Sequence, residues 1–333
     1  MWSVVIGGEK VVAAGALRFP GVALLIDAAS RVVSLGRRGR VLGLFRGLGT
    51  AIIVVVLAYA IYRNAGQFQE ASLSLDYTLV GLSTGLWLLG YLLFALGWDL
   101  VLRRLGSSIG WWRASRVWFL SQGLKYIPGS VAYAVGRVHL AREEGVQGIP
   151  AALGLALENL LPLATAVLLF LALLPFGLVQ TLPSNLTVGV LLAAVALTLS
   201  LPLFLGRLPA IWPGSRNISL GYKALAALLA FYVLVWLVVG LACYLSFRSL
   251  GQDFPLSLWQ VLGLYAISWA GGLVAVFAPG GLGVRDGILI VLMSNFIPFP
   301  LAAAGAAVVR VQTLAVEGLL ALLAMKLWPI TKT

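Results

Sequence analysis

Residues 279–287 read Pro-Gly-Gly-Leu-Gly-Val-Arg-Asp-Gly and lie inside an apolar segment that runs from 255 to 297. Proline removes a backbone hydrogen-bond donor and glycine loosens a helix, so a helix through this segment should break here. A second apolar segment, 111–137, is interrupted in the same way by Ile-Pro-Gly-Ser at 127–130. Broken backbone at membrane depth is stable only where protein or a wet cavity satisfies its polar groups. The sequence therefore predicts two re-entrant helical hairpins within a membrane.

The composition agrees with a membrane location. Of 333 residues, 61% are hydrophobic and 10% are charged, and the mean hydropathy is +1.02. Soluble domains have about 45–50% apolar and about 25% charged residues, so a soluble enzyme is excluded. One Cys and one His argue against a disulfide, a thiolate cluster or a His-based zinc site. We expect no cofactor, no metal and no nucleic-acid partner, and we attribute the net charge of +12 to cytoplasmic loops and anionic lipid.

Apolar runs predict an all-α, polytopic integral membrane protein. A membrane helix needs about 20 apolar residues. With the two hairpins, we expect about six full spans, at 47–62, 77–100, 150–174, 186–206, 221–247 and 299–326. Residues 1–46 form a basic arm with an amphipathic helix at the cytoplasmic face, and residues 47–333 form the transmembrane domain. The basic loops then fall on one side, which places both termini in the cytoplasm of a prokaryotic cell, at its plasma membrane.

Two stretches align without gaps and predict an internal repeat. Residues 91–106 read YLLFALGWDLVLRRLG and residues 236–251 read WLVVGLACYLSFRSLG, and both end in Arg-x-Leu-Gly. The repeat halves are then 77–174 and 221–326, with hairpins that enter from opposite sides of the membrane. Inverted-topology repeats of this kind are typical of transporters, whose substrate site lies near the bilayer midplane where broken helices meet. The two repeats would rock to alternate access.

Charges inside a bilayer are costly, and each is a candidate for a functional site. Near the first break, a helix that begins after Gly129 would present free N–H groups to a phosphate, beside Lys125, Pro128 and Ser130. The alternative is that Lys125 reaches to the membrane surface and the Pro-Gly pair only bends a loop. Arg137 follows in the next helix and is a further phosphate candidate.

At the second break, Gly280, Gly281 and Gly283 offer a flexible turn before Arg285 and Asp286. Arg285 could bind a phosphodiester through two hydrogen bonds. The alternative is that Arg285 forms an ion pair with Asp286 or with Glu158 and only holds the hairpin.

Three further charges lie within predicted spans. Glu158 is near the centre of its span and must be paired or protonated, with a hairpin cation as the preferred partner. Arg310 and Glu317 are two turns apart on one helix face, where they form either a polar stripe facing the hairpins or a structural stripe. The many Trp and Tyr residues are assigned to interfacial belts.

The motifs together resemble a known family. The Lys125-x-x-Pro-Gly-Ser block, Arg137, Leu-Glu158, the Pro-Gly-Gly-Leu-Gly-Val-Arg285-Asp block and Arg310 are similar to the transmembrane domain of lysylphosphatidylglycerol synthases. The resemblance covers 77–326 and includes flippase-like proteins in which this domain occurs alone. It implies movement of aminoacylated phospholipid between leaflets. No synthase domain precedes Thr333, so we expect no aminoacyl transfer and no enzyme activity.

This chain departs from the family where members often have Glu-Arg, here Glu158-Asn159, and Arg-Glu, here Arg285-Asp286. Because of these two departures, the resemblance does not identify the lipid headgroup. We therefore expect a lipid flippase or scramblase for an anionic or aminoacylated phospholipid or a polyprenyl-phosphate-type lipid. The alternatives are a membrane-embedded lipid-modifying enzyme, a small-solute or ion transporter, and a structural partner of another membrane protein. The sequence also leaves open whether the protein is a homo-oligomer.

Overall fold

The computed structural model describes residues 4–6, 9–11, 74–126, 131–173, 196, 198, 200–203, 206–207, 220–251, 254–275, 279–281 and 283–327. Near the N-terminus, strands β1 (Val4–Ile6) and β2 (Glu9–Val11) pair antiparallel, with Val5 opposite Lys10. Several predictions lie wholly or largely outside the described residues: the amphipathic helix of the arm, the spans 47–62 and 186–206, and the triplet Pro128, Gly129 and Ser130.

The described helices form two sets with the same order. The first set is α4 (Tyr77–Arg104), α5 (Trp111–Gln122), the short 3-10 helix η3 (Gly123–Tyr126), α6 (Val131–Glu143) and α7 (Gly148–Leu173). In each set, a long helix is followed by a broken pair of short helices and then by another long helix.

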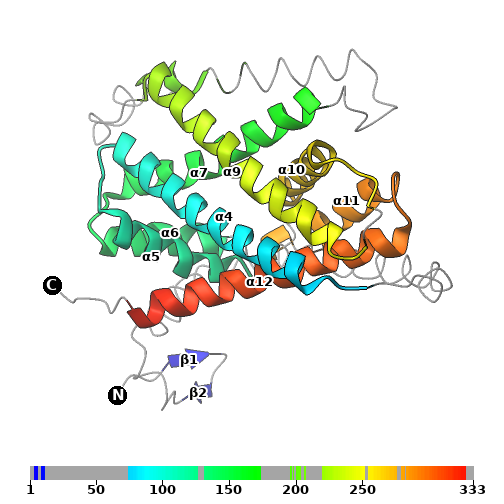
Figure 1. Ribbon diagram of the computed structural model, residues 1–333. Coiled ribbons are helices and arrows are strands. Elements are labelled where there is room, and N and C mark those ends of the chain that lie inside the picture. Colours follow the sequence, from blue (N-terminus) through cyan, green and yellow to red (C-terminus); the bar gives the residue numbers. More distant parts are fainter. Residues whose placement is uncertain are drawn as a thin grey trace.

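The second set is α9 (Tyr222–Arg248), α10 (Leu258–Val274), η6 (Pro279–Gly281), α11 (Val284–Met293) and α12 (Phe299–Leu327). The predicted break at the Pro-Gly-Gly stretch thus lies between α10 and α11. The first predicted break, at 127–130, falls outside the described residues, between the end of η3 and the start of α6. Figure 1 shows α4 and α9 side by side at the centre of the molecule, and α12 crossing beside them.

Local sequence explains where these helices begin and end. Asp76 caps α4, because its carboxylate accepts hydrogen bonds from the backbone N–H groups of Thr78 (2.9 Å) and Leu79 (3.1 Å). Ser257 and Gln260 form a reciprocal capping box at the start of α10. These caps satisfy backbone donors that the helix itself leaves unpaired.

Glycine is required at the second break. Gly280, Gly281 and Gly283 have φ values of 59°, 66° and 77°, a region that residues with a side chain rarely adopt. A Cβ atom at Gly281 would also lie 3.2 Å from the carbonyl oxygen of Gly272 in α10. Gly281 and Gly272 therefore let the turn pack directly on the preceding helix α10.

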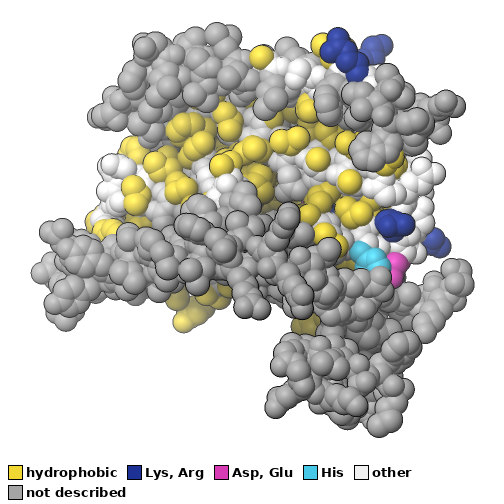
Figure 2. Space-filling view, turned by 180° about the vertical axis from the view of Figure 1, so that it is seen from behind, with side chains coloured by type: hydrophobic (Ala, Val, Ile, Leu, Met, Phe, Trp, Pro, Cys, Tyr) yellow, Lys and Arg dark blue, Asp and Glu magenta, His cyan; other side chains and the backbone are white. Residues whose placement is uncertain are grey.

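Four described helices, α4, α7, α9 and α12, are long and apolar enough to cross a membrane. They correspond to the predicted spans 77–100, 150–174, 221–247 and 299–326. The helices beside the breaks have 12, 13, 17 and 10 residues, all below the roughly 20 needed for a crossing. Figure 2 shows hydrophobic side chains across the described middle of one face, with Lys and Arg toward its edges. The protein is thus a multi-pass membrane protein.

Contacts within the first set recur within the second. Helix α4 packs on α5 and α7 as α9 packs on α10 and α12, and the cross-contact α7–α10 corresponds to α12–α5. The two gap-free aligned stretches also make equivalent contacts: Leu102 packs against Gly154, and its aligned residue Phe247 packs against Gly305. These recurring contacts are what an internal repeat would produce.

A buried glutamine joins three of the long helices. The Gln312 side-chain nitrogen, on α12, lies within hydrogen-bond distance of the Val80 carbonyl oxygen (3.0 Å), Ser83 Oγ (2.7 Å) and Thr84 Oγ1 (3.0 Å) on α4. Its Oε1 accepts a hydrogen bond from Ser246 Oγ on α9, at 2.7 Å. This network couples α12, α4 and α9 through side chains that are buried away from solvent.

Gly305 provides a test of the close packing between α9 and α12. A Cβ atom there would meet three ring atoms of the buried Phe247 at 2.8 Å or less. We expect Gly305→Ala to lower the free energy of unfolding by about 1–3 kcal/mol, because a rigid ring in a filled core has no room to move. Thermal unfolding in detergent, followed by tryptophan fluorescence, measures the effect.

Gly318→Ala is the matched control, because it lies on the same helix and a Cβ atom there meets nothing within 4 Å. This control should be neutral or slightly stabilising, since alanine favours a helix more than glycine does. Equal losses in both variants would show that the contact with Phe247 is not the cause.

Candidate functional site

A cavity of about 240 Å³ lies among the described helices, and every helix of both sets contributes a side chain or backbone to its wall. The 3-10 helices η3 and η6 of the two breaks also line it, and they contact each other. The cavity is smaller than the roughly 300–1,000 Å³ of sites for drug-sized ligands. Its size therefore suits a compact polar group rather than a whole lipid molecule.

Eight of the twenty residues that line the cavity are aromatic. Trp87 meets Tyr265 edge to face with ring centroids 5.4 Å apart, and Trp236 meets Trp269 at 5.3 Å. The remaining aromatic lining residues are Tyr91, Phe94, Trp118 and Tyr133. Ring contacts of this kind bury much apolar surface, so the cavity has a largely apolar wall.

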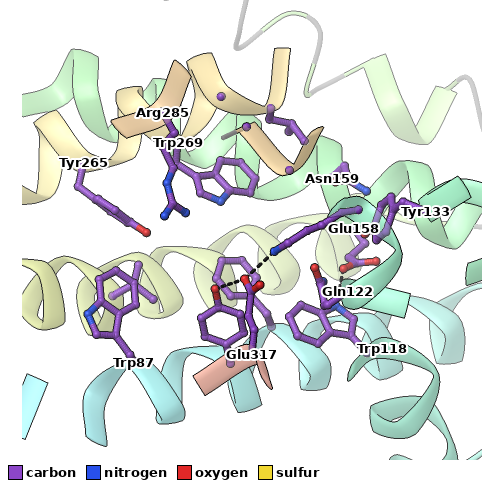
Figure 3. A pocket seen from close by; sticks show the side chains of 18 of the residues that line it. Trp87, Trp118, Gln122, Tyr133, Glu158, Asn159, Tyr265, Trp269, Arg285 and Glu317 are labelled. Carbon is purple, nitrogen blue, oxygen red and sulfur yellow. Dashed lines mark hydrogen bonds and ion pairs between the residues drawn. The ribbon is translucent and has the colours of Figure 1, made fainter. Parts of the chain in front are cut away.

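The first charged group is an ion pair between the two helix sets. Lys125, in η3, places its Nζ atom 2.5 Å from Oε1 of Glu317 on α12. The Tyr91 hydroxyl, on α4, donates a hydrogen bond to the same oxygen. Figure 3 shows Glu317 at this meeting point on the cavity floor. Lys125 thus does not reach to the membrane surface, which removes that alternative for this residue.

The position of Tyr91 has an equivalent in the second helix set, where the side chain and its hydrogen-bond partner are different. Trp236 aligns with Tyr91 in the gap-free repeat, and its Nε1 atom donates to Thr165 Oγ1 on α7 at 3.1 Å. The tyrosine of the first set instead meets Glu317 on α12. Tyr91 and Trp236 thus take equivalent positions on α4 and α9 and line the same cavity, but they meet different partners.

The second charged group is a fully buried ion pair. Arg137 on α6 has 0% exposed surface, and its Nη1 atom lies 2.5 Å from Oε2 of Glu158 on α7. The Trp118 indole N–H donates to the other Glu158 oxygen at 2.5 Å. Ser121 accepts a hydrogen bond from the Arg137 Nε–H, and the guanidinium lies over the rings of Trp98 and Trp118. Glu158 is therefore ion-paired to a cation on α6, the helix that follows the first break, and this pairing agrees with the preference from the sequence.

The third charged group has more positive than negative charge. The Nε atoms of Arg285 on α11 and Arg310 on α12 both lie 3.6 Å from oxygens of Asp286, beyond hydrogen-bond distance. The Nη2 atom of each arginine is buried and has no hydrogen-bond partner. Asp286 also accepts a long hydrogen bond from the Gly283 backbone N–H, at 3.4 Å. One carboxylate is thus shared between two guanidinium groups.

Arg285 is the member of this group that faces the cavity. It is 9% exposed, lines the cavity wall, and lies 5.9 Å from the centroid of the Tyr265 ring. Figure 3 shows its guanidinium pointing into the space between Tyr265 and Glu317. A buried guanidinium N–H group without a hydrogen-bond partner is costly unless an anion meets it. The geometry therefore provides a built position for an anionic group.

The structure brings most of the predicted site residues together. Those that line the cavity are Lys125, Glu158, Gly280, Gly281, Arg285 and Glu317. Arg137, Asp286 and Arg310 are behind the wall, each near a charged neighbour, and Gly283 is the N-cap of α11. Pro128, Gly129 and Ser130 lie outside the described residues. Among those described, no group of three or more His, Cys, Asp or Glu comes together as in a metal site.

The aromatic wall was missed from the sequence. Trp87, Trp118 and Trp236 are 2%, 3% and 1% exposed, so their assignment to interfacial belts is wrong. They lie inside because their rings pack on one another and on the charged groups, and their indole N–H groups donate to Ser246, Glu158 and Thr165. The spacing of Trp87, Tyr91 and Phe94 on one helix face was a signal for this wall.

The sequence also matches a known family. The model for the lysylphosphatidylglycerol synthase TM region matches residues 47–321. The chain belongs to this family. It is therefore a lysylphosphatidylglycerol synthase-like membrane domain, with a membrane role related to lipids, and the resemblance seen in the two Pro-Gly blocks is confirmed. No curated protein sequence matches the chain.

Proposed function

We propose that this lysylphosphatidylglycerol synthase-like domain is a lipid flippase or scramblase. The headgroup would occupy the aromatic cavity, and the acyl or isoprenyl tails would remain in the surrounding lipid. The observation that carries the proposal is the buried Arg285 guanidinium, which faces the cavity with an unpaired Nη2 atom. A cation of this kind can bind the phosphate of a lipid headgroup through two hydrogen bonds.

The depth of the cavity supports a role in crossing the membrane. Tyr91 and Trp236, which line the cavity, lie near the middle of α4 and α9, two helices of spanning length. A polar site at mid-depth lowers the barrier for a charged headgroup, which otherwise would have to cross about 30 Å of hydrocarbon. A surface-binding role would not need a charged cavity at this depth.

The short helices support re-entrant hairpins as part of the same proposal. Helices α5 and α6, and α10 and α11, would enter the membrane from opposite sides and meet at the cavity through η3 and η6. This plan is an inverted-topology repeat, with the breaks at the midplane. Both termini would be cytoplasmic in a prokaryotic plasma membrane, because Arg103 and Arg104 end α4 on the side of the basic loops.

A leaflet-translocation assay tests the proposal. The full chain is placed in liposomes that contain a trace of tail-labelled fluorescent phospholipid, and dithionite quenches the outer leaflet. Wild-type protein should allow quenching beyond the outer half, whereas protein-free liposomes should not. No translocation of phosphatidylglycerol, phosphatidylethanolamine or a polyprenyl phosphate by folded protein would contradict the proposal. It would favour the alternatives of a lipid-modifying enzyme or a solute transporter.

Lys125→Gln should slow translocation about tenfold or more. The substitution removes the cation that pairs with Glu317 and leaves an unbalanced carboxylate on the cavity floor, where it would repel an anionic headgroup. The initial rate of dithionite quenching measures the effect.

Lys223→Gln serves as the control, because it makes the same chemical change at an exposed position on α9. Its rate should equal that of wild type. A similar loss in both variants would place the effect of Lys125 outside the cavity.

A further inference from the structure

The charges around the cavity do not balance. Four cations, Lys125, Arg137, Arg285 and Arg310, face three anions, Glu158, Asp286 and Glu317. Lys125 and Arg137 each have their own carboxylate, with nitrogen and oxygen 2.5 Å apart. Asp286 is the remaining anion, and its oxygens lie 3.6 Å from both Arg285 and Arg310. The chain between the described parts of the breaks, at 127–130, 276–278 and 282, contains no ionisable side chain. The described cavity region therefore carries one positive charge in excess.

We propose that the cavity selects a headgroup whose only charge is one phosphodiester monoanion. This inference rests on the proposed function, since it names the class of lipid that the same cavity would take. A phosphodiester supplies the single negative charge that the described groups lack. It would be held by Arg285, which lines the cavity and has a buried Nη2 atom without a hydrogen-bond partner.

The excess charge matters because the wall is apolar. In water, one unmatched charge costs little, but in a site lined by aromatic rings each unmatched charge carries a large desolvation cost. A phosphate monoester, with two negative charges, would leave one of them unmatched. A zwitterionic headgroup would bring an ammonium group into a site where Glu158 and Glu317 already have cationic partners.

The guanidinium group of Arg285 also suits a diester in geometry. A diester has two free oxygens, which match the two parallel N–H donors of one arginine. Arg310 lies behind Asp286 and does not line the cavity, so Arg285 is the described arginine that a ligand inside would meet first. The remaining diester oxygens carry the headgroup alcohol and the lipid backbone and need no further cation.

A pair of lipids that differ by one methyl group and one charge tests the selectivity. Tail-labelled phosphatidylmethanol is a monoanionic diester, and phosphatidic acid with the same tails is a monoester. At pH 8.5 the monoester is a dianion, because its second pKa is about 6. In wild-type proteoliposomes, phosphatidylmethanol should be translocated at least tenfold faster than phosphatidic acid, and faster than phosphatidylcholine.

Asp286→Asn provides the second measurement. It removes one negative charge and keeps a side-chain oxygen for the Gly283 N–H, so the excess becomes two positive charges. The preference should then shift toward phosphatidic acid by about tenfold or more. Asp76→Asn is the matched control: it makes the same change at an exposed helix cap, which asparagine also fills, and should leave the ratio unchanged.

The possible results separate this inference from the proposed function. Equal rates for phosphatidylmethanol and phosphatidic acid in wild type, or an unchanged ratio in Asp286→Asn, would overturn the charge selectivity and leave lipid translocation standing. Translocation of none of the lipids would overturn both. A tenfold preference that shifts in Asp286→Asn and not in Asp76→Asn would support both.

Discussion

Arg285→Ala should abolish lipid translocation while leaving the protein folded. The guanidinium lines the cavity and has a buried Nη2 atom without a hydrogen-bond partner, so it contributes to binding an anion more than to the resting fold. A hydrogen bond to a charged group contributes about 1.5–3 kcal/mol. Loss of two such bonds corresponds to a fall in rate of about a hundredfold or more. The dithionite assay measures it with the diester lipid.

The thermal stability of the same variant separates a binding role from a structural one. Arg285 shares Asp286 with Arg310 and has a buried Nη2 atom without a hydrogen-bond partner, so its removal should leave the unfolding temperature unchanged or raise it. Arg285→Lys should be intermediate in activity, since it keeps the charge but loses the planar pair of donors. Arg248→Ala, at the exposed end of α9, is the control and should behave as wild type. A large loss of stability in Arg285→Ala with normal translocation would contradict this assignment.

Arg137→Met should cause the largest loss of stability. Arg137 is fully buried, and its partner Glu158 would be left as an unpaired carboxylate among Trp118 and other aromatic rings. Breaking one side of a buried ion pair typically costs about 3–5 kcal/mol. Thermal unfolding in detergent, followed by tryptophan fluorescence, gives the size of the loss. Arg104→Met, at the exposed end of α4, should be close to neutral.

The double variant Arg137→Met with Glu158→Gln tests the cause of that loss. If the unpaired carboxylate is responsible, adding Glu158→Gln should recover part of the stability, and the two substitutions should not be additive. Additive losses would show that Arg137 acts through its packing on Trp98 and Trp118 rather than through its charge.

Local sequence was sufficient to predict the long helices and the position of the second break. The Pro-Gly-Gly stretch ends one helix and begins another, because proline lacks a donor and Gly280 and Gly281 adopt positive φ. The long apolar runs similarly predicted α4, α7, α9 and α12. These features depend on neighbours in the chain, which the sequence displays directly.

The partners of the charged side chains were harder to predict. Lys125 and Glu317 are 192 positions apart, and their pairing depends on how η3 packs against α12. The sequence left open whether Arg285 meets Asp286 or Glu158, and the structure places it near Asp286, which Arg310 also shares. Helical periodicity gives the face of a helix but not the helix that this face meets. For the same reason, Trp87 and Trp236 could not be placed inside the protein.

The hydrogen bonds of Gln312 restrict how the protein could move. This side chain joins α12 to α4 and α9, which belong to different repeat halves. Rocking of one half against the other as two rigid bodies would break the hydrogen bonds between Gln312 and α4 at each cycle, and breaking buried hydrogen bonds is costly in apolar surroundings. The three long helices are better understood as a fixed frame. A movement that opened the cavity would then have to involve the short helices beside the breaks.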